Sequence, residues 1–251
     1  MVRDLLVRGM LVGILAGLLC FGFLKIYGEP QVDRAIAFET QMDEAKAKAE
    51  MAKGMPMPAD EPELVSRPMQ ASWGLLTGVM AYNIAFGGLF ALAFAFVFGR
   101  LEATSSPRVA AVLVALTGFI AIYLVPNLKY PANPPSVGNP DTIGMRTALY
   151  FLMIAISLGT MILAANMRKA LVGRWGNWNA TLIVAACYLA VVVIAALLMP
   201  VIDEVPEAFP AVILWKFRVA SMGAQIIMWS TLALVFGAFA EKLMVPNRVA
   251  A

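Results

Sequence analysis

The chain has 251 residues, of which 61% are hydrophobic and 14% are charged, and its formal net charge is +3. A soluble globular protein is about half apolar and about a quarter charged, so this chain has too little polar surface to cover itself in water. The composition therefore predicts an integral membrane protein in contact with the lipid bilayer, and the small positive charge gives no basis for a nucleic-acid partner. No histidine is present, so the commonest metal ligand is missing.

Six apolar runs are each long enough to cross a bilayer, which takes about 20 mostly apolar residues. They are expected at residues 5–26, 73–98, 109–125, 147–166, 181–199 and 217–240. We expect an all-α polytopic fold, a single transmembrane domain over residues 1–251, arranged as three helical hairpins. The similar hairpin exits LVPNLKYP and LLMPVIDEVPEAFP have two interpretations, a repeated unit and the chance likeness of apolar helices.

The distribution of lysine and arginine predicts the orientation, because short cytoplasmic loops are rich in both. Basic residues are dense in the short segments on the side of the two termini, at Arg3, Arg8, Arg100, Arg108, Arg168, Lys169, Arg174, Lys242 and Arg248. We therefore expect a multi-pass protein of the cell membrane (inner or plasma membrane) with both termini in the cytoplasm. The first long loop, residues 27–72, and the proline-rich loop then face outward.

The long outer loop contains a predicted helix of its own, at about residues 32–53. Its apolar residues recur every three or four positions, as on one face of a helix: Ala35, Phe38, Met42, Ala45 and Ala49. Such a helix either packs on the bundle or lies in the membrane interface. The segment MPMPADEPE that follows is acidic and is expected to be mobile.

A proline-rich stretch, YLVPNLKYPANPPSVGNPDTIGMRTALYF, connects the third and fourth apolar runs over residues 123–151. Pro131, Pro134 and Pro135 each lack an N–H group and have a fixed φ, so the stretch cannot be helical there. Residues before a proline are also restricted to extended conformations. We expect a stiff outer loop with a defined shape.

Seven carboxylates on the outer side are candidate metal ligands: Glu29, Asp33, Glu39, Asp141, Asp203, Glu204 and Glu207. Weak, exchangeable carboxylate coordination would suit the capture and release of a cation. The alternative is that they are ordinary solvated acids or favourable charges near helix N-termini. Both interpretations stay open at the level of sequence.

Arg146 and Arg218 each begin an apolar run at the outer boundary. A guanidinium costs roughly 2.5–3.5 kcal/mol at the centre of a membrane helix, but at the edge it can pair with a carboxylate. We expect these arginines to pin the loops through acids such as Asp141, Asp203 or Glu204, and a gating role is the alternative.

Within the apolar runs, Asn83 and Gln225 are the polar residues that could line a path for an ion. Hydrogen bonding between helices is the alternative role for both. No phosphate-binding loop, serine elbow or zinc box is present, so we expect neither an enzyme nor a resident cofactor.

Several stretches resemble one known family: GEPQVDRAIAFE (28–39), VSRPMQASWGLLTG (65–78), GGLFALAFAFVFGRL (87–101), LKYPANPPSVGNPDTIGMRTALYF (128–151) and PVIDEVPEAFPAVILWKFRVAS (200–221). Together they resemble the CbtA family, the predicted membrane subunit of a cobalt transporter, over nearly the whole chain. The resemblance implies Co²⁺ as the transported ion and a link to cobalamin metabolism. It also implies a small single-span partner with a histidine-rich tail, or other membrane subunits.

The chain departs from that family in the loop before the VSR stretch. Relatives often carry histidines there, whereas this loop reads KGMPMPADEPE. Cobalt would then be held by oxygens, by methionine sulfur or by a partner's histidines. Two functions follow: the membrane subunit of a cobalt (divalent transition metal) uptake transporter, or a structural or accessory subunit without transport activity of its own. A polar path through the bundle would favour the first, and an interior sealed by Leu, Phe and Met the second.

Overall fold

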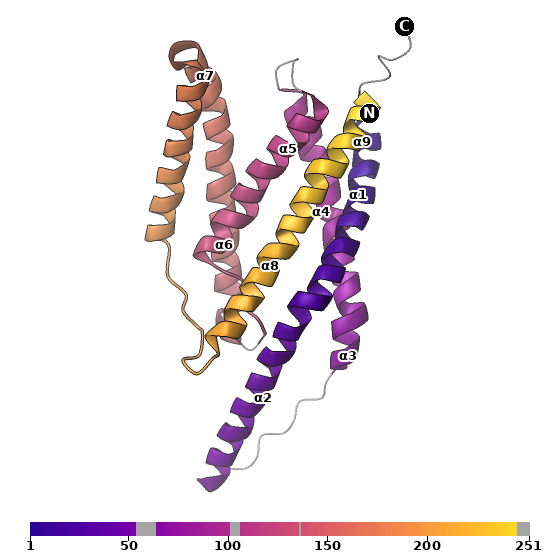
Figure 1. Cartoon of the computed structure of the whole chain (residues 1–251). Helices are drawn as coiled ribbons and strands as arrows, with labels where there is room; N and C mark the ends of the chain where they lie inside the picture. Colours follow the sequence, from indigo (N-terminus) through magenta and orange to yellow (C-terminus); the bar gives the residue numbers. More distant parts are fainter. Residues whose placement is uncertain (54–63, 101–105, 136, 245–251) are drawn as a thin grey trace. The chain divides into compact units, whose positions relative to one another are not determined.

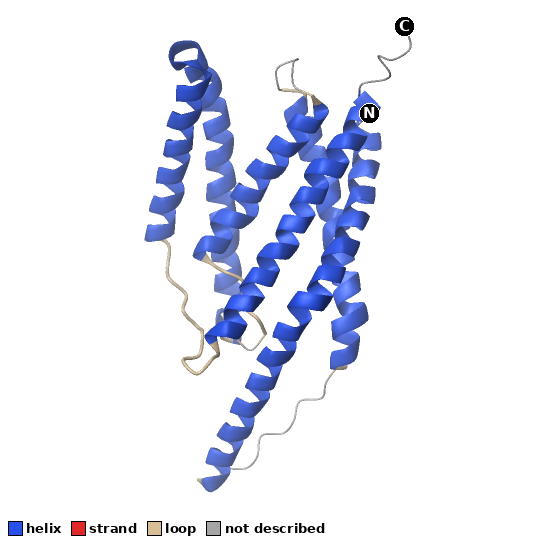
Figure 2. Ribbon diagram, viewed as in Figure 1, coloured by secondary structure: helices blue, strands red, loops and turns tan. Residues whose placement is uncertain are grey.

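The computed structural model describes residues 1–53, 64–100, 106–135 and 137–244, and these residues form helices and loops without a strand (Figure 2). The predicted all-α class is confirmed. Five helical segments in the described part of the chain are long and apolar enough to cross a membrane: Val2–Ala52, Arg67–Phe98, Pro107–Lys129, Pro140–Leu198 and Ala211–Met244. The acidic segment predicted to be mobile, at 55–63, lies outside the described residues.

The contacts within the chain define two compact units. The first comprises residues 1–112, 133–137 and 205–251, and the second comprises residues 113–132 and 138–204. The single transmembrane domain expected over residues 1–251 stays a prediction.

In the first unit, one helical rod begins at the N-terminus and runs far beyond the expected end of the first span. Helix α1 (Val2–Phe23) passes through a π-helical turn, η1 (Leu24–Gly28), into α2 (Glu29–Ala52) without interruption (Figure 1). Pro30 would ordinarily break a helix, because it lacks an N–H group and its ring clashes with the carbonyl four residues earlier. The wider π turn directly before it relieves this conflict.

The apolar face predicted on α2 is only partly buried. Ala35 is buried, and the ring of Phe38 meets Phe209 edge to face at a centroid distance of 5.1 Å. Ala45 and Ala49 are exposed. The described structure therefore packs the first half of α2, while the second half extends without such contacts, stabilised by good helix-forming residues.

The hairpin between α1 and α4 is held together by close backbone contact. A short α3 (Arg67–Met69) and a π turn, η2 (Gln70–Gly74), lead into α4 (Leu75–Phe98). Gly9 and Gly13 of α1 lie against Asn83 and Gly87 of α4, and a Cβ on Gly13 would lie 2.9 Å from the Cα of Ile84. Small residues allow this approach, which is how membrane helices gain van der Waals contact.

Aromatic rings fill the space between α4 and the last helix of the first unit. That helix consists of α8 (Ala211–Thr231), a π turn, η5 (Leu232–Phe236), and α9 (Gly237–Met244). Trp229 meets Phe86 edge to face at 5.0 Å, and Phe236 meets Phe90 and Phe94 at 5.3 and 5.1 Å. Trp229 and Phe236 are buried, so this part of the unit is dry and closely packed.

The first and last helices of the first unit share one end. Arg8 donates from Nη1 to the backbone carbonyl of Phe239 at 2.7 Å, and Arg108 forms an ion pair with Glu241. Basic residues predicted to lie on the side of the termini thus gather at the same end of this unit.

Most of the helix that continues past Pro126 belongs to the second unit. Helix α5 (Pro107–Gly118) runs through a π turn, η3 (Phe119–Leu124), into α6 (Val125–Lys129), so the predicted end at residue 125 is four residues too early. Here, too, a π turn ends two residues before a proline. The sequences IYGEP (26–30) and IYLVP (122–126) share this arrangement.

Helix α7 (Ile143–Leu198) is the main element of the second unit and folds back on itself at Gly176 (Figure 1). Gly176 has φ 72° and ψ 168°, values that interrupt the helix and that a residue with a side chain rarely adopts. The result is two arms, 143–175 and 177–198. They meet through buried Met153, Val184 and Tyr188.

Candidate functional site

Arg67 binds two of the seven candidate carboxylates in the first unit. Its Nη2 contacts Glu29 Oε2 and lies 2.9 Å from Asp33 Oδ1, and its Nε donates to the same Asp33 oxygen at 3.0 Å. Glu29 and Asp33 lie one helical turn apart at the start of α2, so both face the same partner. We call Glu29, Asp33 and Arg67 the arginine triad.

The environment of the triad explains the pairing. The side chain of Glu29 is only 10% exposed, whereas that of Asp33 is 60% exposed. A carboxylate removed from water needs an opposite charge or hydrogen-bond donors, and Arg67 supplies both. The triad ties the rod α1–α2 to the beginning of α3.

Glu204 is bound in the second unit by the residues that start α7. Its Oε2 accepts from the backbone N–H of Asn139 at 2.7 Å, and its Oε1 accepts from the Thr142 hydroxyl at 2.6 Å. Arg146 Nη1 lies 3.5 Å from Oε2. We call Glu204, Asn139, Thr142 and Arg146 the Glu204 clamp, because they join the chain after α7 to the chain before it.

These contacts lower the pKa of Glu204 below its ordinary value of 4.5. The Thr142 hydrogen bond has the largest effect, the Asn139 N–H adds to it, and the charge of Arg146 contributes less, while partial burial acts in the opposite direction. The carboxylate is therefore charged, and it acts as an acceptor near neutral pH.

Local backbone structure positions the Glu204 clamp. The Asn139 side chain accepts from the N–H of Asp141 at 3.0 Å and caps the 3₁₀ turn η4 (Pro140–Thr142), with Pro140 at the first position of the turn. Gly138 has φ 123°, and a Cβ there would collide with the Arg146 guanidinium. Arg146 Nη2 also donates to the Asn139 carbonyl at 3.3 Å.

Arg218, the second arginine predicted to pin a loop, contacts an asparagine of the proline-rich loop within the first unit. Its Nη2 donates to Asn133 Oδ1 at 2.8 Å. Pro134 is buried and its carbonyl accepts from Val137 N–H at 3.3 Å, while Pro135 is exposed and Pro131 half-buried. The expected carboxylate partner is thus an amide at this contact.

The other four candidate carboxylates, Glu39, Asp141, Asp203 and Glu207, are exposed. Among the described residues, no group of three or more Cys, Asp and Glu side chains is arranged to hold a metal ion. Of the seven, Glu29, Asp33 and Glu204 are paired with an arginine within their own unit. Whether any of the seven carboxylates binds a metal stays a prediction.

Of the two residues proposed for a path, Asn83 lies in a packed interior and Gln225 is half-buried. Asn83 is buried and donates to the Val79 carbonyl of its own helix at 2.8 Å, with the Cys20 thiol 3.8 Å from its Oδ1. Cys20 also donates to the Ala224 carbonyl at 3.3 Å. Gln225 lies close enough to the Tyr82 hydroxyl to interact with it. These contacts join α1, α4 and α8.

The sequence carried some signals for these contacts. Arg67 precedes the second apolar run, yet its partners lie 38 and 34 residues away, so sequence could not pair them. The Asn-Pro-Asp-Thr segment at 139–142 has the composition of a capped helix start, so the position of this cap could be predicted from the sequence.

Long apolar helices whose ends carry arginine–carboxylate pairs define a helical membrane protein. The chain matches the family described as "Probable cobalt transporter subunit (CbtA)" over residues 2–241, and it belongs to that family. No curated protein and no solved structure matches the chain. Membership makes it a multi-pass membrane protein of cobalt transport, in agreement with the resemblance seen in the sequence, and a transporter subunit acts with other subunits in a lipid bilayer.

Proposed function

We propose that the chain is the membrane-spanning scaffold of a cobalt uptake transporter and that histidines of a partner subunit supply the tight metal ligands. One observation carries this proposal: Glu29, Asp33 and Glu204, the carboxylates with the most defined surroundings, are bound by Arg67 and Arg146. A carboxylate paired with a guanidinium gives up that partner before it can bind Co²⁺. The chain also lacks the imidazoles that suit this ion.

We further propose that α7 contributes two spans, which gives six spans and places both termini in the cytoplasm. The interruption at Gly176 supports this number, because each arm of α7 is long enough to cross the hydrocarbon. The cluster of Arg8, Arg108 and Lys242 at one end of the first unit supports the orientation, since cytoplasmic ends are rich in lysine and arginine.

The seven carboxylates then divide into two groups with different roles. Glu29, Asp33 and Glu204 hold the loops together through Arg67 and Arg146. The exposed acids Glu39, Asp141, Asp203 and Glu207 attract the cation to the outer surface by charge alone. Arg218 holds the proline-rich loop through Asn133.

A second candidate, an accessory subunit without transport of its own, is favoured by the packing of the first unit. Among its described residues, the buried side chains between α1, α4 and α8 are apolar or small apart from Cys20, Asn83 and Thr231. Thr231 donates to the Ile227 carbonyl of its own helix, so it does not offer a free polar group. The fully buried part of this interior is therefore largely apolar.

Cobalt accumulation in cells separates the two candidates. The chain is expressed alone, with the histidine-rich single-span partner, and with that partner after Glu39, Asp141, Asp203 and Glu207 are all changed to the corresponding amides. We expect accumulation above the empty vector only with the partner, and a lower rate at low cobalt in the amide variant. If cobalt accumulates neither with the chain alone nor with the chain and its partner, the accessory role is favoured. Uptake by the chain alone would overturn the shared-ligand proposal.

A matched variant controls for folding. Glu29→Gln, Asp33→Asn and Glu204→Gln together remove the pinning carboxylates and are expected to lower the amount of folded protein in the membrane. If this variant instead folds normally and loses only cobalt uptake, these three residues are metal ligands and our division of the acids is wrong.

A further inference from the structure

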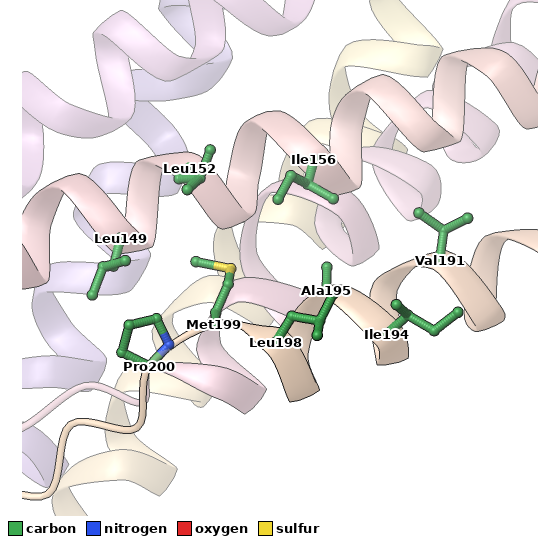
Figure 3. Close-up of a pocket in the computed structure, with 9 residues that line it drawn as sticks. All are labelled: Leu149, Leu152, Ile156, Val191, Ile194, Ala195, Leu198, Met199 and Pro200. Carbon is green, nitrogen blue, oxygen red and sulfur yellow. The ribbon is translucent and has the colours of Figure 1, made fainter.

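An apolar groove of about 440 Å³ opens between the two arms of α7 (Figure 3). Its lining side chains come from both arms and include Leu149, Leu152, Ile156, Ile194, Ala195 and Leu198. In Figure 3 the side chains of Leu149 and Ile156 extend from the first arm toward the second. All of these residues belong to segments apolar enough to lie in the hydrocarbon of a membrane.

The volume of the groove limits what can fill it. The groove falls in the range of sites for small ligands, about 300–1,000 Å³. Its apolar lining offers water almost no hydrogen-bond partners. A lipid acyl chain is narrow and apolar, and acyl chains surround apolar segments of this kind in a membrane, so one chain fits the groove.

The positively charged side chain of Lys129 lies near one end of the groove. Pro200 lines this end, and its carbonyl accepts a hydrogen bond from the Tyr130 hydroxyl at 2.9 Å. The Lys129 ammonium lies 5.7 Å from the centre of the Tyr130 ring. Lys129 forms no ion pair with a carboxylate in the described part of the chain. Its charge is therefore available to an anion beside the apolar groove.

Two carboxylates follow this end of the groove in the chain. Glu204 is bound by the other residues of the Glu204 clamp. Asp203, three residues after Pro200, is an exposed carboxylate. A neutral or cationic headgroup would gain nothing from Lys129, whereas a phosphate with net negative charge would. Lysine at the end of a membrane helix commonly reaches into the headgroup region in this way.

We propose that the α7 groove and Lys129 form a binding site for an anionic phospholipid of the surrounding membrane. One acyl chain occupies the groove between the two arms, and the headgroup phosphate pairs with the Lys129 ammonium at its end. The lipid fills the space that the two arms leave open.

Native mass spectrometry of the purified full-length chain tests this site. The protein is extracted in mild detergent and equilibrated with phosphatidylglycerol or phosphatidylcholine, and the retained lipids are counted. We expect one tightly retained phosphatidylglycerol. Lys129→Gln should reduce the preference for phosphatidylglycerol about fivefold, the size expected for one lysine at a membrane surface. Lys216→Gln, at an exposed lysine of α8 that does not line the groove, should leave it unchanged.

A second pair of variants tests the groove itself. Ala195→Phe fills the groove and should abolish the retained lipid, whereas Ala186→Phe, at an exposed position of the same arm outside the lining, should not. Equal retention of both lipids by the wild type would overturn the proposal, as would normal retention by Ala195→Phe. Loss of a co-purifying polypeptide instead of a lipid in Ala195→Phe would also overturn it and assign the groove to a partner helix. None of these readouts depends on cobalt uptake.

Discussion

The two compact units hold their helices together in different ways. In the first unit, the backbones of α1 and α4 touch at Gly9, Gly13 and Gly87, and aromatic rings fill the remaining space. In the second unit, the arms of α7 meet through larger side chains, and a Cβ added at Gly159 or Gly173 would meet nothing within 4 Å. Of the apolar span in the α7 segment, 17% is buried, compared with 39% in the α1–α2 segment.

The difference shows what replaces the hydrophobic effect inside a membrane. Lipid tails are as apolar as leucine, so helices associate through close van der Waals contact and through hydrogen bonds. The first unit uses close contact between α1 and α4. The second unit buries a smaller share of its apolar span, and its two arms leave an apolar groove open between them.

The largest effect is expected where the contact in the first unit is closest. Gly13→Leu places a side chain against the backbone of Asn83 and Ile84, and we expect a loss of about 3 kcal/mol in the free energy of unfolding, at the upper end for overpacking. Unfolding by SDS titration in mixed micelles measures this. Gly22→Leu on the same helix, where a Cβ meets nothing within 4 Å, is the control and should be nearly neutral. Equal effects would show that α1 and α4 are not in contact.

The arginine triad should come next in size. Arg67→Ala leaves the poorly exposed Glu29 without its partner, and we expect a loss of about 2 kcal/mol. This is less than the roughly 3–5 kcal/mol seen for fully buried pairs, because Asp33 is well exposed and screened by water. The double variant Arg67→Ala with Glu29→Gln should recover part of the loss, and additive losses would mean that the two residues do not interact.

A smaller effect is expected inside the second unit. Ser157 and Tyr188 share a buried hydrogen bond of 2.7 Å between the arms of α7. Hydrogen bonds between membrane helices average about 0.6 kcal/mol in double-mutant cycles, so Tyr188→Phe should cost about that much. Combining it with Ser157→Ala completes the cycle, and a coupling free energy of zero would remove this bond as a source of stability.

The smallest effect concerns pH. The folded state lowers the pKa of Glu204 below 4.5, so its contribution to stability is fully present above 4.5 and disappears as the pH falls through the lower, folded value. Melting temperatures from about pH 6 to pH 3 should therefore fall less steeply in Glu204→Gln than in the wild type. Glu207→Gln, at an exposed acid, should follow the wild type. A Glu204→Gln profile parallel to the wild type would contradict the Glu204 clamp.

Much of this architecture could be predicted from the sequence, because hydropathy depends only on local composition. The apolar runs and the break of the helix in the proline-rich stretch follow directly. The continuity of α1 and α2 could not be predicted, since Pro30 is tolerated only because a π turn precedes it. The Gly9, Gly13 and Gly17 spacing was readable as a close-packing pattern and was overlooked.

The candidate site was harder to predict, for a physical reason. Acids in outer loops look alike in sequence, whether they are solvated, bound to arginine or free to hold a metal. Glu204 and Glu207 differ by three positions, yet one is bound by Thr142 and Asn139 and the other is exposed. Only the spatial position of a partner distinguishes them, and those partners are distant in the chain.

Equilibrium binding of Co²⁺ to the purified full-length chain, followed by isothermal titration calorimetry, tests the shared-ligand proposal most directly. If the arginines occupy the structured carboxylates and the tight ligands belong to a partner, the chain alone should show only weak binding that does not saturate. Addition of the histidine-rich partner should produce a saturable site. Tight, stoichiometric binding by the chain alone, lost when Glu29, Asp33 and Glu204 are changed to amides, would contradict the proposal and make those residues the metal site.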